Sequence, residues 1–309
     1  MIRKQKNTAL SFTLCIHGEA VAGHGEDSYQ LDQTDGRALA AVFDGCGGSG
    51  ARCYANYAGN SGAYMASRAV CGAADIWFRG TELSRETLTQ AIRQALEVCR
   101  THAGASNGLR GNIGKSFPTT AAMVLAEPDG AEVAARCFWA GDSRCYSLDA
   151  DGLHQLTLDD TDEPDALRNL SGDGVLTNLI CADGSFALHE AQLRLTSPCL
   201  LFAATDGCFG YIRTPMLFEY VIIRTLVEAQ SLRSWQQALD SVFAECAGDD
   251  YSLCLLAYGY DSFAALQRAF RARVETLEAL YTAETLDVEA AWAQYRTDYE
   301  RWLFRTARA

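Results

Sequence analysis

The sequence lacks most of the features that mark structural zinc proteins, membrane proteins and secreted proteins. None of its twelve cysteines forms a Cys-x-x-Cys pair, and none is spaced with the five histidines as zinc ligands are. No run approaches the roughly 20 apolar residues that cross a membrane. Residues 1–6 are basic but precede neither the apolar stretch nor the cleavage site of a signal peptide. We therefore expect a reduced, cytoplasmic protein with no membrane partner.

Positive charge is also scarce, since 26 Lys and Arg residues stand against 39 Asp and Glu, a formal net charge of -13. Proteins that bind nucleic acid through its phosphates carry an excess of basic residues, so we expect no nucleic-acid partner. A phosphorylated substrate would need a local cationic site, which bound metal ions can supply. The length of 309 residues is ample for a buried core in one large domain or two smaller ones.

Two apolar segments of the chain end in the same way. Residues 38–43 run into Asp44, residues 200–204 run into Thr205 and Asp206, and a glycine follows each aspartate. A carboxylate at the edge of a core is costly unless it pairs with a cation or binds a metal. Aspartate oxygens are ligands that suit Mg²⁺ or Mn²⁺. The sequence therefore predicts a metal-centred hydrolase.

The hydrophobic patterns predict runs of strands separated by groups of helices, which is typical of an α+β protein. Strands are expected at 9–17, 37–43, 119–127, 131–148, 199–205 and 251–258. Helices are expected within 50–79, from an N-cap at Ser84 to about 102, and over 215–246. The acidic residues 159–173 are expected to form an irregular, solvated loop. We find no internal repeat.

The pattern changes after Gly259, where apolar residues begin to step by three or four. This spacing predicts two amphipathic helices, a hairpin broken near residues 282–285. We expect their apolar stripe to pack on the rest of the chain. The alternative is that it stays available for a protein partner or for self-association.

Six short motifs, most of them acidic, follow one another along the chain. They are Gly25-Glu26-Asp27, Phe43-Asp44-Gly45-Cys46-Gly47-Gly48, Thr119-Thr120-Ala121, Ala140-Gly141-Asp142-Ser143-Arg144, Thr205-Asp206-Gly207 and Asp249-Asp250-Tyr251-Ser252. In this order the motifs resemble those of the metal-dependent protein phosphatases of type 2C, in their bacterial form, over about residues 10–258. The resemblance implies a four-layer αββα fold, in which helices flank a central β-sandwich of two mostly antiparallel sheets. It also divides the chain into a phosphatase domain, 1–260, and a C-terminal helical extension, 261–309.

The resemblance implies a signalling enzyme that hydrolyses phosphoserine and phosphothreonine in proteins with two Mg²⁺ or Mn²⁺ ions and a third, weaker one. The metal ligands that it implies are Glu26, Asp27, Asp44, Gly45 through its carbonyl, Asp142, Asp206 and Asp249. Asp44 would bridge the two main ions, and Asp142 would help to hold the weaker one. A metal-activated water, positioned through Asp44, Asp206 and Asp249, would attack the phosphate.

The chain departs from the family pattern at two places. Cys46 stands where the family often has a histidine that acts as general acid, and a thiol is a weaker proton donor near pH 7. Ala22 stands where the family often has an arginine that grips phosphate, which leaves the nearby His24 as the candidate for substrate binding. These departures keep a second hypothesis open: a non-catalytic phosphatase-like module that binds a protein partner through its helical tail.

The glycine-rich turn also permits a different interpretation. Residues 45–50 formally satisfy the G-x-G-x-x-G pattern of dinucleotide-binding proteins. Asp44, however, would point a negative charge at the pyrophosphate, and no second strand ending in an acidic residue follows about 20 residues later. We therefore disfavour a nucleotide site there.

Overall fold

The computed structural model describes residues 8–104, 116–170, 174–183, 186–281 and 287–303. Ten strands form two antiparallel sheets, one in the order β1-β10-β9-β6-β7 and the other in the order β2-β3-β4-β5-β8. The strands are β1 (Leu10–Gly18), β2 (Ser28–Thr34), β3 (Arg37–Phe43), β4 (Ala121–Asp129), β5 (Glu132–Ala140), β6 (Arg144–Asp149), β7 (Gly152–Gln155), β8 (His189–Thr196), β9 (Cys199–Ala204) and β10 (Tyr251–Tyr258).

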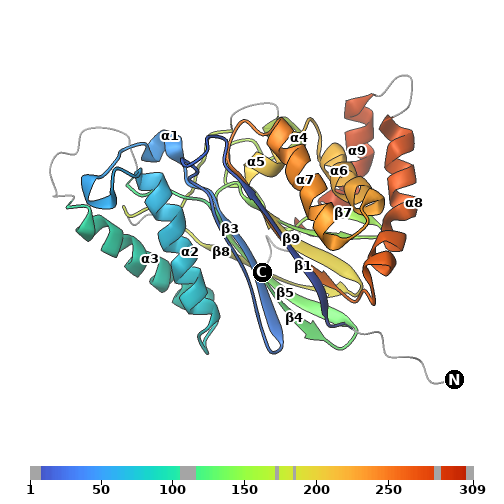
Figure 1. Ribbon diagram of the computed structural model, residues 1–309, viewed down its shortest axis with the longest axis horizontal. Coiled ribbons are helices and arrows are strands. Elements are labelled where there is room, and N and C mark those ends of the chain that lie inside the picture. Colours follow the sequence, from blue (N-terminus) through green and yellow to red (C-terminus); the bar gives the residue numbers. More distant parts are fainter. Residues whose placement is uncertain (1–7, 105–115, 171–173, 184–185, 282–286, 304–309) are drawn as a thin grey trace.

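Helices cover the outer face of each sheet, which gives the four layers that the sequence predicts (Figure 1). The helices are α1 (Gly47–Gly50), α2 (Gly62–Phe78), α3 (Arg85–His102), α4 (Ala166–Asn169), α5 (Asp206–Phe209), α6 (Pro215–Glu228), α7 (Leu232–Cys246), α8 (Phe263–Tyr281) and α9 (Val288–Tyr299), with a 3₁₀ turn at Ala55–Tyr57. The layer of α2 and α3 packs on the sheet that contains β3. The layer of α6 to α9 packs on the sheet that contains β9.

Strand β3 shows why the segment before Asp44 is apolar on both faces. Ala40 and Val42 point into the core between the sheets, whereas Leu39 and Phe43 point into the core under α2 and α3. A strand covered on both sides has no solvent face and therefore no polar alternation. The hydrophobic run that sequence analysis identifies is thus a central strand of the sandwich.

Several predicted elements are confirmed at their boundaries. Strands were expected at 37–43 and 251–258, and β3 and β10 occupy these residues. Ser84 is the N-cap of α3: its side chain accepts a hydrogen bond from the Thr87 backbone NH, and the Thr87 side chain accepts one from the Ser84 backbone NH. This reciprocal pair is a capping box, which fixes where the helix begins.

The prediction of one strand over 131–148 is wrong. The chain leaves β5 at Ala140, turns at Gly141 with φ of 99°, and enters β6 in the other sheet. A side chain on Gly141 would meet Thr120 within 2.6 Å, so the turn depends on glycine. The prediction also missed β2 and β8, and the helical stretch 215–246 is two helices, with Ser231 as the N-cap of the second.

The two predicted C-terminal helices are present as α8 and α9, and the predicted break near 282–285 lies outside the described residues. Phe270 of α8 and Trp292 of α9 belong to the same buried cluster as Phe202 of β9 and Phe218 of α6. Their apolar stripe therefore packs on the sandwich, as expected. The domain boundary at residue 260 stays a prediction.

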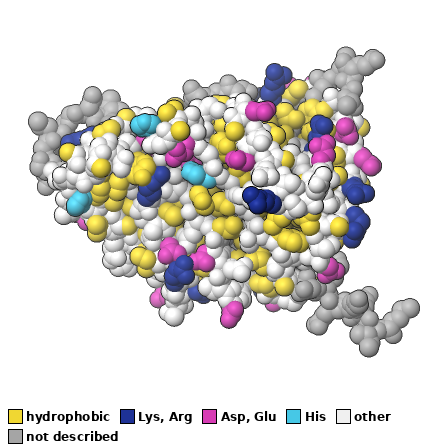
Figure 2. Space-filling model, in the orientation of Figure 1, with side chains coloured by type: hydrophobic (Ala, Val, Ile, Leu, Met, Phe, Trp, Pro, Cys, Tyr) yellow, Lys and Arg dark blue, Asp and Glu magenta, His cyan; other side chains and the backbone are white. Residues whose placement is uncertain are grey.

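Two further observations concern the charge on the surface and the length and polarity of the helices. On the face drawn in Figure 2, acidic and basic side chains are interspersed, so the negative net charge is not gathered there into one field. Within the described residues, every helix is too short or too polar to cross a membrane.

Candidate functional site

Four carboxylates from distant parts of the chain share one open pocket of about 410 Å³. They follow the ends of β3, β5 and β9 or precede the start of β10. The residues that line the pocket are Asp44, Gly45, Cys46, Gly47, Gly48, Ser49, Asp142, Gly174, Leu176, Leu179, Asp206 and Asp249. Antiparallel sheets bring these ends to one edge of the sandwich.

The backbone around Asp44 is held by the segment before β4. The Asp44 carbonyl accepts hydrogen bonds from the Thr119 hydroxyl at 2.6 Å and from the Thr120 NH at 2.8 Å. The Cys46 NH donates to the Pro118 carbonyl at 3.2 Å. The Thr119-Thr120 motif therefore fixes the turn that carries Asp44.

Asp27 lies behind the pocket, where it is 2% exposed. Its Oδ2 accepts hydrogen bonds from the hydroxyls of Thr205 at 3.0 Å and Ser252 at 2.8 Å, whereas its buried Oδ1 has no partner among the residues that the structure describes. Thr205 directly precedes Asp206, so this contact ties two acidic motifs that are far apart in the sequence. A buried acceptor without a donor is uncommon and needs an explanation.

Glu26 lies beside the glycine turn. Its Oε1 accepts a hydrogen bond from the Ser61 hydroxyl, and its Oε2 is 2.2 Å from the position that a Cβ on Gly47 would take. Two residues fix the backbone here: Asp250 accepts from the Glu26 NH at 2.5 Å, and Arg68 donates to the Gly25 carbonyl at 3.0 Å. Sequence analysis assigned no role to Asp250 or Arg68, because their contacts join segments far apart in the chain.

Asp142 follows the Gly141 turn, and its buried Oδ1 also has no partner. Asp160 holds this turn in place with two hydrogen bonds. Its carboxylate accepts one from the Gly141 NH at 3.0 Å, and its backbone NH donates one to the Gly141 carbonyl at 3.0 Å. The Asp160 carboxylate also accepts from Asn178 at 2.6 Å and lies 2.9 Å from His189 Nε2. Asp160 is thus a positioning residue that sequence analysis missed.

The acidic segment 159–173, as far as the structure describes it, is irregular as expected apart from the short helix α4, but the expectation that it is solvated is wrong for two of its carboxylates. Asp159 forms a buried ion pair with Arg144 at 2.6 Å, and Asp165 pairs with Arg296 of α9 at 2.7 Å. Arg144 is therefore a structural partner of Asp159.

Burial and mutual repulsion raise the pKa of the carboxyl groups in and behind the pocket. Burial is the main cause for each group, and the charges of neighbouring aspartates also raise the pKa, whereas the hydrogen bonds from Ser252 and Thr205 act to lower that of Asp27. The pKa of Asp27 and of Asp142 rises to about 8, that of Asp206 rises to about 6, and that of Asp44 rises well above its usual value. Carboxylates so placed favour a compensating cation.

His24 and Cys46 differ in where the structure places them. His24 is exposed and is not among the residues that line the pocket. Cys46 lines it, and burial, followed by the charges of Asp44, Asp142 and Asp206, raises the pKa of its thiol well above the usual value. The Cys46 thiol is therefore neutral near pH 7 and a poor proton donor.

The donors that the pocket offers are those of a hard divalent cation: carboxylate oxygens and a backbone carbonyl. The unpartnered buried Oδ1 atoms of Asp27 and Asp142 fit such a group. Among the described residues, however, no three His, Cys, Asp or Glu side chains are arranged to hold an ion without moving.

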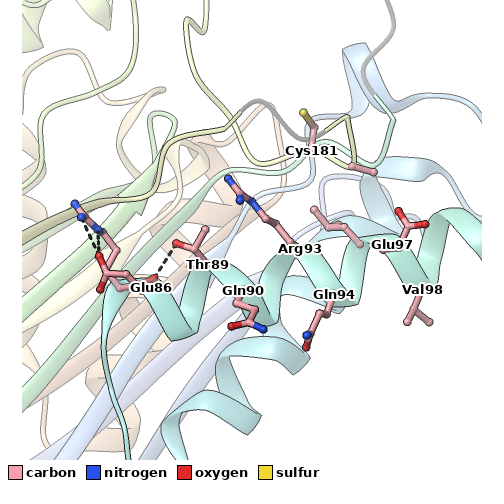
Figure 3. A pocket seen from close by; sticks show the side chains of 11 residues that line it. Glu86, Thr89, Gln90, Arg93, Gln94, Glu97, Val98 and Cys181 are labelled. Atoms are coloured by element: carbon pink, nitrogen blue, oxygen red, sulfur yellow. Dashed lines mark hydrogen bonds and ion pairs between the residues drawn. The ribbon is translucent and has the colours of Figure 1, made fainter.

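A larger groove of about 960 Å³ runs along α3 beside Cys181 (Figure 3). Its walls carry Arg85 paired with Glu86, and Arg93 and Glu97 from the next turns of the helix. This groove lacks the converging carboxylates of the smaller pocket. We therefore assign the chemistry to the smaller pocket that the carboxylates line, although the groove along α3 is larger.

A protein-family model described as protein phosphatase 2C matches residues 23–248, more than half of the chain. The chain belongs to the protein phosphatase 2C family. The matched region includes five of the six acidic positions around the pocket and ends one residue before Asp249. The ligand roles of the individual residues in this family member stay predictions.

Solved structures share the fold of this family member at low sequence identity. The Mycobacterium tuberculosis serine/threonine phosphatase PstP/Ppp matches with a TM-score of 0.58 and 15% identity, over 81% of this chain and 99% of that one. PppA, described as a key regulatory component of T6SS in Pseudomonas aeruginosa, matches with a TM-score of 0.55 and 19% identity, over 82% of this chain and 99% of that one. A PstP catalytic domain in complex with two manganese ions matches with a TM-score of 0.53 and 17% identity, over 80% of this chain and 97% of that one. A search of curated proteins found no match.

Proposed function

We propose that this chain is a Mg²⁺- or Mn²⁺-dependent protein phosphatase that hydrolyses phosphoserine and phosphothreonine in cytoplasmic proteins. The observation that carries the proposal is the convergence of Asp44, Asp142, Asp206 and Asp249 on one pocket, with Glu26 and Asp27 beside it. Gathering six carboxylates in and around one pocket is costly unless a cation compensates their charges. Family membership supports the same reaction class.

The residues proposed to hold two ions, and a third weaker one, are Glu26, Asp27, Asp44, Gly45 through its carbonyl, Asp142, Asp206 and Asp249. When bound, such ions activate a water and neutralise charge on the phosphoryl oxygens. The structural relative with two manganese ions supports this cofactor class.

The protein's own residues shape the rest of the pocket. Gly47 and Gly48 form one wall, where the absence of side chains leaves room for a phosphoryl group. Leu176 and Leu179 add apolar side chains to the lining. The neutral Cys46 thiol adds no negative charge that would repel a phosphate.

The test compares hydrolysis of an aryl phosphate and of a phosphothreonine peptide with Mn²⁺, with Mg²⁺ and after chelation. We expect activity that depends on the metal. Asp206→Ala should lower this activity by more than about 100-fold, because removing a metal ligand has a larger effect than altering the groups that hydrogen-bond to a ligand. The thermal midpoint of Asp206→Ala without metal should not fall, since the change removes one of the repelling charges.

Equal turnover in Asp206→Ala and the unaltered chain would refute the assignment. A chain that is folded but inert with every metal would support the second hypothesis, a phosphatase-like module that binds a partner. The structure favours catalysis over that module, because α8 and α9 bury their apolar stripe against the sandwich instead of presenting it to a partner.

A further inference from the structure

Two cysteines lie directly opposite each other on the neighbouring strands β1 and β10. Cys15 and Cys254 are register partners in the antiparallel ladder, and their Sγ atoms are 3.2 Å apart. The two residues are 239 positions apart in the sequence, so no local pattern reveals the pair. Neither thiol belongs to the phosphatase pocket.

The two thiols differ in their access to solvent. Cys15 is partly exposed, whereas Cys254 is fully buried. Cys15 opens onto a cavity of about 350 Å³, lined by Cys15, Ile16, His17, Tyr29, Arg233, Gln236, Gln237 and Asp240. A small oxidant that enters this cavity reaches Cys15 before the buried Cys254, and the side chains of Arg233 and Asp240 line the same cavity.

We propose that Cys15 and Cys254 are a reversible disulfide site that a hydroperoxide oxidises. The Cys15 thiolate attacks the peroxide, so that an S–O bond forms, the O–O bond breaks, and the leaving oxygen departs as water after taking a proton. Cys254 Sγ then attacks Cys15 Sγ, so that the S–S bond forms, the S–O bond breaks, and the proton of Cys254 leaves with the hydroxide as water. The two thiols lose two electrons to the peroxide, and an external dithiol reverses the reaction.

The ladder geometry permits this bond without a change of register. Opposite residues of an antiparallel pair have Cβ atoms about 4.5–5.5 Å apart, and a disulfide needs about 3.5–4.5 Å. A local approach of the strands by about 1 Å, with rotation of the side chains, is therefore sufficient.

Two other sets of thiols in the chain serve as comparisons. Cys137 and Cys145 are hydrogen-bonded to each other between the sheets, where both side chains are fully buried. These two thiols could form a disulfide by the same reaction as the proposed pair, but neither of them lines a cavity among the described residues. Cys71, whose thiol donates to the Tyr29 carbonyl at 3.4 Å, is the alternative partner to consider for Cys254.

The test uses the full chain, reduced, freed of reductant and treated with hydrogen peroxide before free thiols are alkylated. Trypsin then releases peptide 7–37, which has Cys15 as its one cysteine, and peptide 234–268, which has Cys246 and Cys254. A Cys246→Ser background makes the assignment unambiguous. We expect mass spectrometry to find these peptides linked, with a yield at least about 10-fold above that of a Cys137–Cys145 link, and dithiothreitol to release them.

The variant Cys15→Ser provides the second measurement. We expect Cys254 to remain reduced in this variant, because the route from solvent to its buried thiol passes through Cys15. Three results would overturn the proposal: a Cys254–Cys71 link instead, Cys15 oxidised further while Cys254 stays free, or Cys254 oxidised equally fast in Cys15→Ser. Equal linkage of both thiol pairs would also overturn it, because it would mean oxidation of an unfolded chain.

Discussion

Two adjacent glycines after Asp44 differ in what surrounds them. A Cβ on Gly47 would lie 2.2 Å from Glu26 Oε2, whereas a Cβ on Gly48 would have no atom within 4 Å. Both residues belong to the short helix α1, so a change to alanine alters the backbone preference equally. Any difference between the two variants therefore reports on the contact with Glu26.

We expect Gly47→Ala to displace the Glu26 carboxylate and to weaken Mn²⁺ binding about 10- to 100-fold, the usual effect of disturbing the groups around a metal ligand. Gly48→Ala should bind Mn²⁺ like the unaltered chain. Isothermal titration calorimetry measures both affinities directly. Equal affinities for the two variants would mean that Glu26 takes no part in the metal site.

Cys46 permits a prediction about proton donation. Because burial and nearby aspartates raise the pKa of its thiol, Cys46 holds its proton too firmly to protonate a leaving group well near pH 7. An imidazole has a pKa near 6.5, so Cys46→His should gain on the order of 10-fold in kcat on a phosphothreonine peptide. The gain should be small on an aryl phosphate, whose leaving group is a weak base, and absent in Cys46→Ser. No gain on the peptide would exclude position 46 from proton transfer.

The sequence predicts the carboxylates that line the pocket because each stands beside a hydrophobic strand. It does not predict the residues that position them. Asp250 holds Glu26 across 224 positions, and Asp160 holds Gly141 and lies beside His189, 29 positions away. Such contacts arise from the packing of distant segments, which leaves no periodicity in the sequence.

At the scale of elements, helices α6, α8 and α9 meet at one buried charge. Glu219 of α6 is fully buried; it accepts two hydrogen bonds from Arg273 of α8, the shorter at 2.6 Å, and one from the Tyr295 hydroxyl of α9 at 2.5 Å. Removing one partner of a buried ion pair leaves an uncompensated charge, which destabilises a protein strongly.

Arg273→Ala should therefore lower the free energy of unfolding by about 3 kcal/mol, the lower end of the range for a broken buried pair, because Tyr295 remains as a donor. Arg271 lies on the same helix but is exposed, and Arg271→Ala should change stability by less than about 0.5 kcal/mol. Urea unfolding compares the two variants. If they unfold at the same concentration, the Glu219 contacts do not hold the helices together.

Element prediction failed where two strands of different sheets follow each other closely. Only residues 141–143 separate β5 from β6, and most residues of both strands are buried in the sandwich. What separates the strands is the backbone at Gly141, and the same turn brings Asp142 to the pocket. The local pattern reports burial, whereas the direction of the chain is set by one glycine and its fit against Thr120.

At the scale of the whole molecule, the pocket draws on both sheets, and the C-terminal helices contact a segment that contributes to its wall. Asp44 follows β3 of one sheet, and Asp206 follows β9 of the other. Arg296 of α9 pairs with Asp165, which caps α4 in the segment between β7 and β8 that also contributes Gly174 to the pocket wall. The C-terminal helices are therefore connected to the pocket through packed structure.

A chain that ends at residue 260 tests the proposed domain boundary. It would lose the buried side chains of Leu266, Phe270, Trp292 and Tyr299 from the cluster around Phe218 and would expose their apolar contacts to water. It would also leave Glu219 without Arg273 and Tyr295. We therefore expect poor solubility, or a thermal midpoint far below that of the full chain.

A chain that ends at residue 303 is the matched control, because it keeps α8 and α9, and it should remain soluble. Size-exclusion chromatography and thermal unfolding distinguish the two truncations. A monodisperse 1–260 chain with an unchanged midpoint would show that the phosphatase domain folds by itself. In that case the helices would be an appendage, and the hypothesis that they serve a protein partner would regain its support.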